Sequence, residues 1–413
     1  MKILVLGSGG REHALCWKLA QSGDAELFAA PGNPGMARVA TCVPVVTGSS
    51  YLEIADAVQA ELTVVGPEAP LVVGVVDEFR GRGRRIVGPS RQAAQLEGSK
   101  VFAKNFFVKN AIPTAEFVTA DNPEDARRAI GRFGYPVVLK ADGLAAGKGV
   151  VVANDRAEAE NALATLHGRL VVEEYLRGEE VSFIALCDGR DVVPLAPTQD
   201  HKAVFDDDRG PNTGGMGAYC DGAILTEKQT QEILDRVIYR TVEETRFTGF
   251  LYAGLMMTAG GPKVLEFNVR LGDPETQPLV HRLQSDFAPV LMAAADGRLR
   301  GTKLDWRPGP SVCVVMASAG YPGAYETGKP ITGIDAAEAT GATVFQAGTR
   351  LLHGRLETAG GRVLGATASG ADLAEAIDGA YAGVARIDFP GMHYRKDIGR
   401  KGLARYNKGT VGT

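Results

Sequence analysis

Residues 140–149 read KADGLAAGKG and lie between two short apolar runs, Val137–Lys140 and Val150–Ala153. The apolar runs predict two β-strands. A strand on each side makes the unit a hairpin, whereas the loop of a P-loop protein leads into a helix. Such a glycine-rich loop costs chain entropy on folding, which argues against a purely structural role. The stretch therefore predicts a loop whose backbone lies against a triphosphate, with Lys140 and Lys148 supplying positive charge.

The chain before this hairpin alternates between strands and helices. Strands are expected at Lys2–Leu6, Glu26–Ala30, Thr63–Val65 and Arg85–Val87, with helices at Arg11–Ala20 and over 71–79. This alternation predicts a parallel, doubly wound sheet with ligand loops at the strand carboxyl ends. The first 98 residues are therefore expected to form a Rossmann-like domain.

Two loops of this domain carry chemistry-bearing residues. Gly7-Ser8-Gly9-Gly10 follows the first strand and opens a helix, where free backbone N–H groups bind phosphate. The dinucleotide pattern GxGxxG is not met, because Glu12 stands at its third glycine. The second loop, 66–70, adds the carboxylate of Glu68. A nicotinamide site is the weaker interpretation, and two plain tight turns are the alternative.

The remainder of the chain is richer in strands. They are expected at Leu170–Glu173, Ser182–Cys187, Leu251–Thr258, Lys263–Phe267, Val312–Ala317, Thr343–Ala347 and Arg362–Ala368, before a helix at Ala371–Ala385. Between them lies a polar, glycine-dense stretch over 199–219, and long loops of this composition are usually functional or disordered. Asp206–Asp208 within it is expected to be a solvated turn.

A hard-cation site is predicted at the end of one strand. Glu266 and Asn268 are two residues apart and therefore point to one face of that strand. A carboxylate and an amide oxygen suit Mg²⁺, which relies on substrate phosphates to complete its coordination. Arg270, one alternation further, is expected on the same face, where it would bind a carboxylate or phosphate. The alternative is an ordinary solvent-facing strand end.

The composition narrows the class of protein. The chain has 413 residues, long enough for about two to four domains. Its 45 basic and 49 acidic residues give a net charge of −4, so nucleic acid is not an expected partner. No apolar run approaches the ~20 residues that span a bilayer, and no secretory signal is visible. The five scattered cysteines are interpreted as reduced core thiols, and a cytoplasmic enzyme is expected.

Taken together, the motifs resemble one family. GSGGREHA (7–14), VGPEAPLVVGVVD (65–77), QLEGSK (95–100), KADGLAAGKG, EFNVRLGDPETQP (266–278) and RKDIG (395–399) occur in the order seen in the glycinamide ribonucleotide synthetases, or phosphoribosylamine–glycine ligases. The resemblance implies an α/β protein of the ATP-grasp fold. Its parts would be an N-terminal parallel-sheet domain (1–98), an ATP-grasp domain (99–305) with an α+β lid (about 118–176), and a C-terminal β-rich domain (306–413).

The resemblance and the motifs also imply site residues. ATP contacts are expected from Lys104, Lys140, Gly147, Lys148, Gly149, Glu173, Tyr175, Leu176 and Glu180. Mg²⁺ or Mn²⁺ ligands are expected to be Glu266 and Asn268. Catalytic roles are expected for Arg270, Lys140, Asp200 and Lys202. Substrate contacts are expected from Gly9, Gly10, Glu12, Glu68, Asn212, Gly214 and Asp273.

The implied reaction joins glycine to 5-phosphoribosylamine at the expense of ATP, through a glycyl phosphate. The enzyme would be a monomer or small homo-oligomer with small-molecule partners only, and no membrane. Two departures from the family pattern stand out: the segment 166–170 is short, and Gly254 stands near a place where some ATP-grasp enzymes carry an acidic metal ligand. The alternatives are another ATP-grasp ligase with a different acid or amine, a nicotinamide-dependent oxidoreductase, and a nucleotide sensor.

Overall fold

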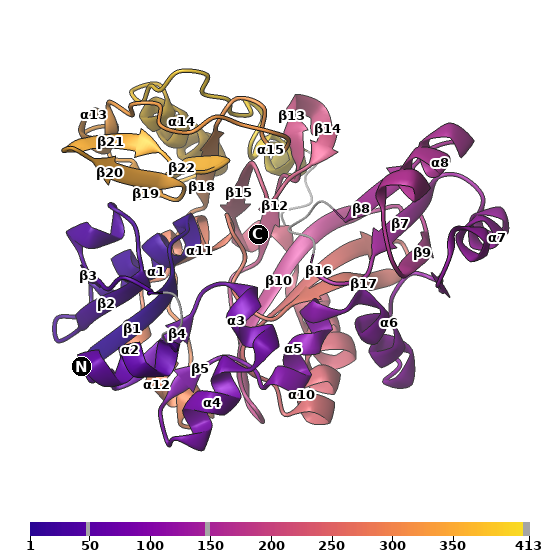
Figure 1. The fold of residues 1–413 in the computed structure, drawn as a ribbon, viewed down its shortest axis with the longest axis horizontal. Coiled ribbons are helices and arrows are strands. Elements are labelled where there is room, and N and C mark those ends of the chain that lie inside the picture. Colours follow the sequence, from indigo (N-terminus) through magenta and orange to yellow (C-terminus); the bar gives the residue numbers. More distant parts are fainter. Residues whose placement is uncertain (47–49, 145–148, 408–413) are drawn as a thin grey trace.

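The structure is a computed structural model that describes residues 1–46, 50–144 and 149–407 (Figure 1). Its N-terminal part is a five-stranded parallel sheet of order β3-β2-β1-β4-β5. The strands are β1 (Lys2–Gly7), β2 (Glu26–Pro31), β3 (Thr41–Cys42), β4 (Leu62–Val65) and β5 (Ile86–Val87). Residues 3–6 of the central strand β1 are fully buried, as expected where helices cover both faces of a parallel sheet. The predicted doubly wound sheet is confirmed.

The helices of this part are α1 (Gly10–Leu19), α2 (Tyr51–Val58), α3 (Glu68–Val73), α4 (Val75–Gly81) and α5 (Arg91–Gly98). The single helix expected over 71–79 is wrong, because the chain breaks into α3 and α4 at Gly74. This glycine has a φ of +99°, a left-handed conformation that interrupts a helix and that glycine adopts without strain.

The largest sheet has nine strands and runs through the middle of the molecule, in the order β17-β16-β10-β12-β15-β18-β22-β19, with β11 paired to β10. Its members are β10 (Glu179–Asp188), β11 (Val192–Pro194), β12 (Thr198–Asp200), β15 (Gly217–Cys220), β16 (Thr248–Thr258), β17 (Gly261–Asn268), β18 (Ser311–Ala317), β19 (Thr343–Gln346) and β22 (Arg362–Ser369). The C-terminal strands therefore extend the central sheet, because β18 pairs with β15 in the register Ala218↔Cys313. Sequence pattern alone does not reveal such distant pairing.

A separate four-stranded sheet projects to the right in Figure 1 and contains the glycine-rich hairpin. Its order is β6-β9-β7-β8, from β6 (Phe117–Ala120), β7 (Val137–Ala141), β8 (Val150–Ala153) and β9 (Leu170–Glu174), with helices α7 (Pro123–Phe133) and α8 (Arg156–Thr165). Strands β7 and β8 pair antiparallel, with Lys140 opposite Val150, so the predicted hairpin is confirmed. Leu139, Val172 and Ala129 belong to a small core of its own.

The remaining α-helices are α6 (Lys100–Lys109), α9 (Glu227–Ile233), α10 (Tyr239–Thr245), α11 (Thr276–Arg282), α12 (Phe287–Ala295), α13 (Ile334–Glu338), α14 (Leu373–Val384) and α15 (Arg400–Asn407). Two strand pairs lie outside the larger sheets. They are β13 (Ala203–Phe205) with β14 (Arg209–Asn212), and β20 (Thr349–Leu352) with β21 (Arg355–Thr358). The stretch 199–219 thus forms short strands instead of the expected loop. Within the described ranges, no helix combines the length and the apolar character needed to cross a bilayer.

Aromatic side chains join α1 to the far edge of the central sheet. Trp17 stacks on His281 of α11, with ring centroids 5.5 Å apart. His13 meets the edge of Phe345 in β19, also at 5.5 Å, and its Nδ1 accepts a 2.7 Å hydrogen bond from the backbone N–H of Gln346. This bond requires a neutral acceptor nitrogen, and burial and the charge of Arg38 lower the pKa of His13 to about 4.

Acid is therefore expected to weaken this junction. The native pKa of His13 lies below its ordinary 6.5, so its stabilising effect is complete above pH 6.5 and is lost as the pH falls towards 4. Between pH 7 and 4 the free energy of unfolding should fall by about 3 kcal/mol more in the wild type than in His13→Asn, whose amide oxygen still accepts from Gln346. Denaturant titrations at each pH measure this. His353→Asn, at an exposed histidine, is the control and should lose as much free energy of unfolding between pH 7 and 4 as the wild type does.

Candidate active site

A cavity of about 480 Å³ lies where the N-terminal loops, α5, α6, the four-stranded sheet and the central sheet meet. Its walls contain most of the predicted site residues: Glu68, Lys104, Lys140, Gly149, Glu173, Tyr175, Leu176, Glu180, Asp200, Lys202, Asn212, Gly214, Glu266, Asn268, Arg270 and Asp273. Gly147 and Lys148 lie outside the described residues. Predicted residues from widely separated parts of the sequence are thus brought to one place.

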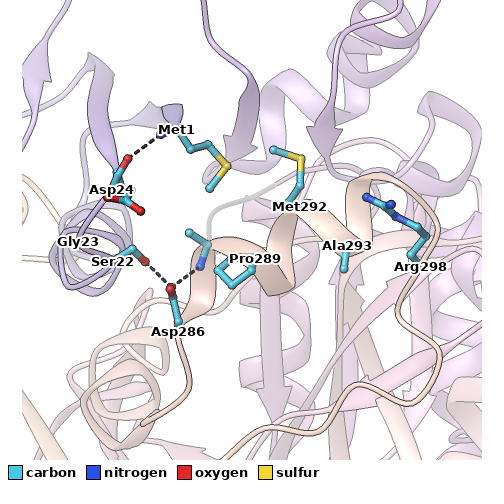
Figure 2. A pocket seen from close by; sticks show the side chains of 11 residues that line it. Met1, Ser22, Gly23, Asp24, Asp286, Pro289, Met292, Ala293 and Arg298 are labelled. Atoms are coloured by element: carbon cyan, nitrogen blue, oxygen red, sulfur yellow. Dashed lines mark hydrogen bonds between the residues drawn. The ribbon is translucent and has the colours of Figure 1, made fainter.

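A second hollow lies between the turn after α1 and helix α12 (Figure 2). Met1, Pro289 and Met292 give it apolar walls, and Ser22 donates a hydrogen bond to Asp286 at its edge. None of the predicted site residues lines this hollow, so it is not part of the candidate active site.

Where the four-stranded sheet borders the cavity, two lysines share one buried carboxylate. Lys104 Nζ lies 3.1 Å from Glu173 Oε1, and Lys140 Nζ lies 3.1 Å from Glu173 Oε2. All three side chains are at most 7% exposed. Burial lowers the pKa of Lys104 to about 8, against the opposing effect of Glu173. One carboxylate facing two ammonium groups leaves an excess positive charge suited to phosphate.

The predicted cation ligands lie on β17, with the expected alternation. Glu266 Oε1 accepts from Lys202 Nζ at 3.2 Å, and Lys202 lowers the pKa of Glu266 to about 2. Asn268 Oδ1 accepts from Arg270 Nη2 at 3.3 Å, which confirms that these side chains share a face. Gly254 is the direct cross-strand partner of Glu266, so β16 adds no carboxylate at that point.

The residues present fit a divalent cation that is completed by its substrate. Within 1–46, 50–144 and 149–407, no three His, Cys, Asp or Glu side chains are arranged to hold a metal. A cation here would depend on Glu266, Asn268 and phosphate oxygens, as Mg²⁺ sites at nucleotides do. Among the described residues, nine acidic and seven basic side chains line the cavity. This excess of carboxylate favours nucleotide entering together with a cation.

Arg270 is held by acceptors from three parts of the chain. Its Nη2 donates to Glu97 Oε1 at 2.8 Å, and its Nε donates to Glu68 Oε2 at 3.3 Å. Nη1 donates to the backbone oxygen of Leu271 at 3.3 Å. Burial alone would lower the pKa of Arg270, but Glu97 and Glu68 outweigh it and raise it. The guanidinium is therefore fixed and permanently charged at the cavity wall.

Asp200 and Lys202 line a further part of the cavity wall, and Lys202 connects it to Glu266. Burial raises the pKa of Asp200 to about 7, although Lys202 opposes the shift, and Glu275 adds to it. Tyr252 and Glu275 also line the cavity, and the hydroxyl of Tyr252 donates to Glu275 Oε1 at 2.8 Å and lies 2.8 Å from Ser182 Oγ. An acid that titrates near neutrality therefore stands beside a lysine.

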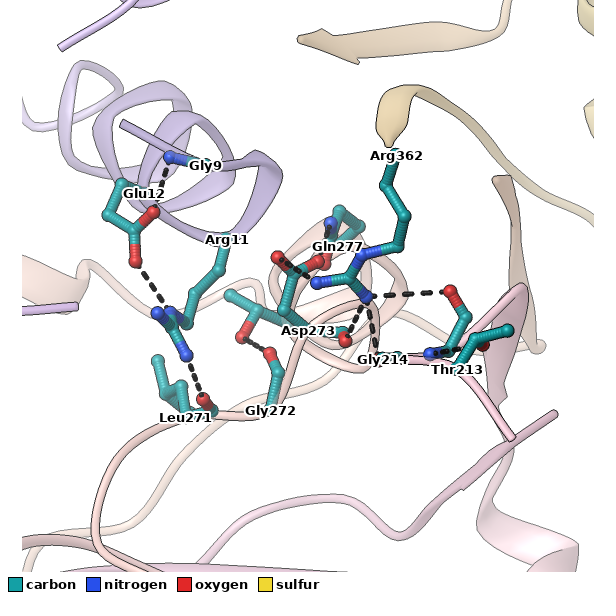
Figure 3. Close-up of polar contacts among 12 residues, drawn as sticks. Gly9, Arg11, Glu12, Thr213, Gly214, Leu271, Gly272, Asp273, Gln277 and Arg362 are labelled. Carbon is teal, nitrogen blue, oxygen red and sulfur yellow. Dashed lines mark hydrogen bonds and ion pairs between the residues drawn. The ribbon is translucent and has the colours of Figure 1, made fainter. Parts of the chain in front are cut away.

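Asp273 and Gly214 are joined to each other by an arginine from β22 (Figure 3). Arg362 Nη1 donates to the backbone oxygens of Asp273 at 2.6 Å and Gly214 at 2.7 Å, and Nη2 lies 3.0 Å from Asp273 Oδ2. The backbone N–H of Gly214 donates to the hydroxyl of Tyr321 at 3.0 Å. The C-terminal part of the chain thus helps to shape the cavity.

Gly9, Gly10 and Glu12 are not among the residues that line this cavity, and their contact with substrate stays a prediction. The carboxylate of Glu12 accepts from the backbone N–H of Gly9 and from Arg11 Nε, both at 2.6 Å (Figure 3). It is 2% exposed and fills the space beside Gly66, where an added Cβ would lie 2.1 Å from Glu12 Oε1. Glu12 therefore fixes the loop, and Arg11 reaches the cavity in its place.

Sequence reasoning missed several residues that line the cavity: Arg11, Glu97, Lys100, Tyr252, Glu275, Tyr321 and Arg362. Arg11, Glu97, Lys100 and Glu275 lie inside the quoted motifs, so the motifs were the available signal. Lys100 Nζ donates to the backbone oxygen of Gly143 at 2.9 Å, in the glycine-rich loop. Tyr321 and Arg362 lie outside those motifs, and only the folded chain places them here.

Comparisons with known proteins agree with this arrangement. The phosphoribosylglycinamide synthetase models match as N domain over residues 1–97, ATP-grasp (A) domain over 98–276 and C domain over 311–401. Curated phosphoribosylamine–glycine ligases from Allochromatium vinosum and Pseudomonas aeruginosa are 51% and 50% identical, and each comparison covers 98% of this chain and 99% of the relative.

Solved structures point the same way. A phosphoribosylamine–glycine ligase from Thermotoga maritima superposes with a TM-score of 0.84 at 36% identity, over 96% of this chain and all of the other. A biotin carboxylase domain from Hydrogenobacter thermophilus, 17% identical, has a TM-score of 0.73 over 95% of this chain and 91% of its own length, a likeness of fold alone. With its N, ATP-grasp and C domain matches in order along one chain, this protein belongs to the phosphoribosylglycinamide synthetase family.

Proposed function

We propose that this enzyme joins glycine to 5-phosphoribosylamine, converting ATP to ADP and phosphate and yielding glycinamide ribonucleotide. The observation that carries the proposal is one cavity with two chemically distinct walls. One wall holds the Lys104–Glu173–Lys140 group beside Glu266 and Asn268. The other holds Asp200 and Lys202, and Lys202 joins the two walls by donating to Glu266 at 3.2 Å. Nucleotide and acceptor can therefore meet in a single site.

In this site the chain's own residues position and neutralise charge. Lys104 and Lys140 would hold the nucleotide phosphates, and Arg270 would stabilise the phosphoryl group in transfer. A divalent cation held by Glu266 and Asn268 would supply further charge neutralisation at the phosphates. A carboxylate oxygen of glycine attacks the γ-phosphorus, and ADP leaves. The protein forms no covalent bond in this step.

The second step forms the amide. The amine nitrogen of phosphoribosylamine attacks the carbonyl carbon of glycyl phosphate, and phosphate leaves. We assign the acceptance of the amine proton to Asp200, whose pKa of about 7 suits a base at neutral pH. The lid would exclude water, which would otherwise hydrolyse the acyl phosphate.

ADP release measured with a panel of acids and amines tests this function. Release should require glycine and phosphoribosylamine together, and omission of either should reduce it to background. Equal turnover with another amino acid would favour a different ATP-grasp ligase, the second candidate. Release that needs neither substrate would contradict ligation.

A nucleotide-binding measurement separates the ligase from an oxidoreductase. ATP with Mg²⁺ at about 100 times its Kd should add ~2.7 kcal/mol to the free energy of unfolding, raising Tm by about 3 °C. NAD(H) and NADP(H) at the same concentration should leave Tm unchanged, because Glu12 breaks the dinucleotide pattern. Thermal scans with each ligand give the comparison, and stabilisation by a dinucleotide alone would reverse the assignment.

The finer assignments are also proposals. We place the enzyme in the cytoplasm as a monomer or small homo-oligomer, with Mg²⁺ or Mn²⁺ as the cation and no nucleic acid or membrane partner. We assign residues 1–98, 99–305 and 306–413 to its three domains, with the lid over about 118–176. The predicted roles of individual site residues, including Tyr175, Leu176 and Glu180 at the nucleotide, belong to the same proposal.

A further inference from the structure

A narrow arm leaves the acceptor wall of the cavity. The arm is the β13–β14 pair with its turn, residues 203–212, and it stands apart beside α15 in Figure 1. Lys202 precedes it, and Asn212 ends it. Thr213 closes its base by donating from its backbone N–H and its hydroxyl to the backbone oxygen of Lys202, both at 2.8 Å. The position of the arm therefore bears directly on Lys202.

The arm cannot hold this position by its own hydrogen bonds. A two-stranded ribbon is marginally stable in water, and the pairing is irregular between Ala203 and Phe205. Residues 207–211 are exposed. Asp207 and Asp208 at its turn have φ of +60° and +54°, a conformation that costs free energy for residues other than glycine. An external anchor is required.

That anchor is the segment 393–401, which contains the RKDIG motif (395–399). Arg395 is fully buried and forms a two-bond pair with Asp397, from Nε to Oδ1 at 2.7 Å and from Nη2 to Oδ2 at 2.6 Å. Its Nη1 donates to the backbone oxygen of Ala203 and to Asp208 Oδ1, each at 3.1 Å. One guanidinium thus joins the start of the arm to its turn.

Further bonds from the same segment reach the rest of the arm. Asp397 Oδ2 accepts from the backbone N–H of Asp207 at 2.9 Å, and Asp206 Oδ1 accepts from that of Lys396 at 2.7 Å. His393 Nε2 donates to the backbone oxygen of Val204 at 2.9 Å. Across the described ranges, every hydrogen bond and ion pair made to the arm from outside 202–213 comes from this segment.

The anchor also reaches the cavity wall behind the arm. His201 lies between Asp200 and Lys202 in the chain and is 1% exposed. Its Nε2 accepts from the backbone N–H of Gly399 at 3.4 Å, two residues beyond Asp397. Lys202 in turn lies 3.2 Å from Glu266. A continuous path of contacts therefore runs from the Arg395–Asp397 pair to the reacting groups.

We propose that Arg395 and Asp397 are positioning residues for ligation, which hold the arm and thereby fix Lys202, Asp200 and Asn212 at the acceptor wall. The Lys104–Glu173–Lys140 group does not depend on them, because α6 and the four-stranded sheet hold it, whereas Glu266 is coupled to the arm through Lys202. This inference rests on the proposed function. It goes further in assigning to the C-terminal RKD segment a specific effect on the acceptor half of the reaction.

Asp397→Asn tests this positioning role. The amide has the shape of the carboxylate, but its NH₂ group cannot accept a hydrogen bond from Arg395, so one of the two bonds of the pair is lost. In the folded variant, kcat/KM for glycine and phosphoribosylamine should fall at least tenfold, and the Kd for ATP without Mg²⁺, which tests the Lys104–Glu173–Lys140 group alone, should change less than twofold. Hydrogen exchange of the 203–212 amides should accelerate, while exchange in β10 and β16 stays at the wild-type rate. Asp397→Glu, which keeps the charge, should recover part of the lost activity.

Asp188→Asn is the matched control. Asp188 is a 9% exposed carboxylate at the far end of β10 that accepts from the backbone N–H groups of Arg190, Asp191 and Leu299. Its loss should lower Tm without changing the kinetics of the folded enzyme. If Asp397→Asn behaves in the same way, or if it weakens ATP binding as much as ligation, the positioning role is refuted. A wild type that lacks substrate-dependent ADP release contradicts the proposed function instead, and the exchange comparison then decides whether the anchor exists.

Discussion

Glu266→Gln is expected to lower kcat about 100-fold or more while the protein stays folded. The Gln form keeps one oxygen at the cavity wall, but it loses the negative charge that retains a hard cation. The charge on Glu266 is well protected, since Lys202 holds its pKa at about 2. The free energy of unfolding should change by no more than about 1–2 kcal/mol, because Lys202 still has a carboxylate partner in Glu180, 4.0 Å from its Nζ.

Glycine-dependent ADP release over a range of Mg²⁺ concentrations, together with thermal unfolding, measures both effects. Asn268→Ala should show a milder loss, since one neutral oxygen is removed. Glu26→Gln, at the exposed start of β2, is the control and should shift stability by within about 0.5 kcal/mol with normal turnover. Near-normal turnover of Glu266→Gln at saturating Mg²⁺ would mean that the metal lies elsewhere.

Arg270→Lys is expected to lower kcat/KM by about 100-fold, despite the conserved charge. The guanidinium reaches Glu97, Glu68 and Asn268 at once. A lysine ammonium on a flexible stem cannot reproduce that planar set of donors. Glu97 would lose its partner while buried, and burial already raises its pKa. Stability should therefore fall as well, by up to about 3 kcal/mol.

Steady-state kinetics and denaturant unfolding of this variant separate the two contributions. Arg85→Lys is the matched control, because Arg85 pairs with Asp296 at 2.6 Å on the surface, where exchange of the cation should change stability by less than about 1 kcal/mol. If the folded Arg270→Lys enzyme has the wild-type kcat/KM, the guanidinium of Arg270 has no specific role in the reaction. A loss confined to stability would make it a purely structural residue.

Much of the local structure was predictable because it depends on neighbouring residues. The alternation of apolar residues specifies β7 and β8, and the glycines between them specify the hairpin. The spacing of Glu266, Asn268 and Arg270 by two residues places them on one face of a strand, whatever the strand packs against. Repeated strand–helix alternation likewise determines a parallel sheet before any contact is known.

Only the tertiary structure decided which distant groups meet. Glu97 and Glu68 are 173 and 202 residues from Arg270 along the chain, and Arg395 is 192 residues from Ala203. Such contacts arise from the packing of whole elements, and short-range periodicity carries no information about them. The same limit applies to Glu12. Its position in the motif was visible in the sequence, but the direction of its side chain was set by the space beside Gly66 and by the partners Gly9 and Arg11.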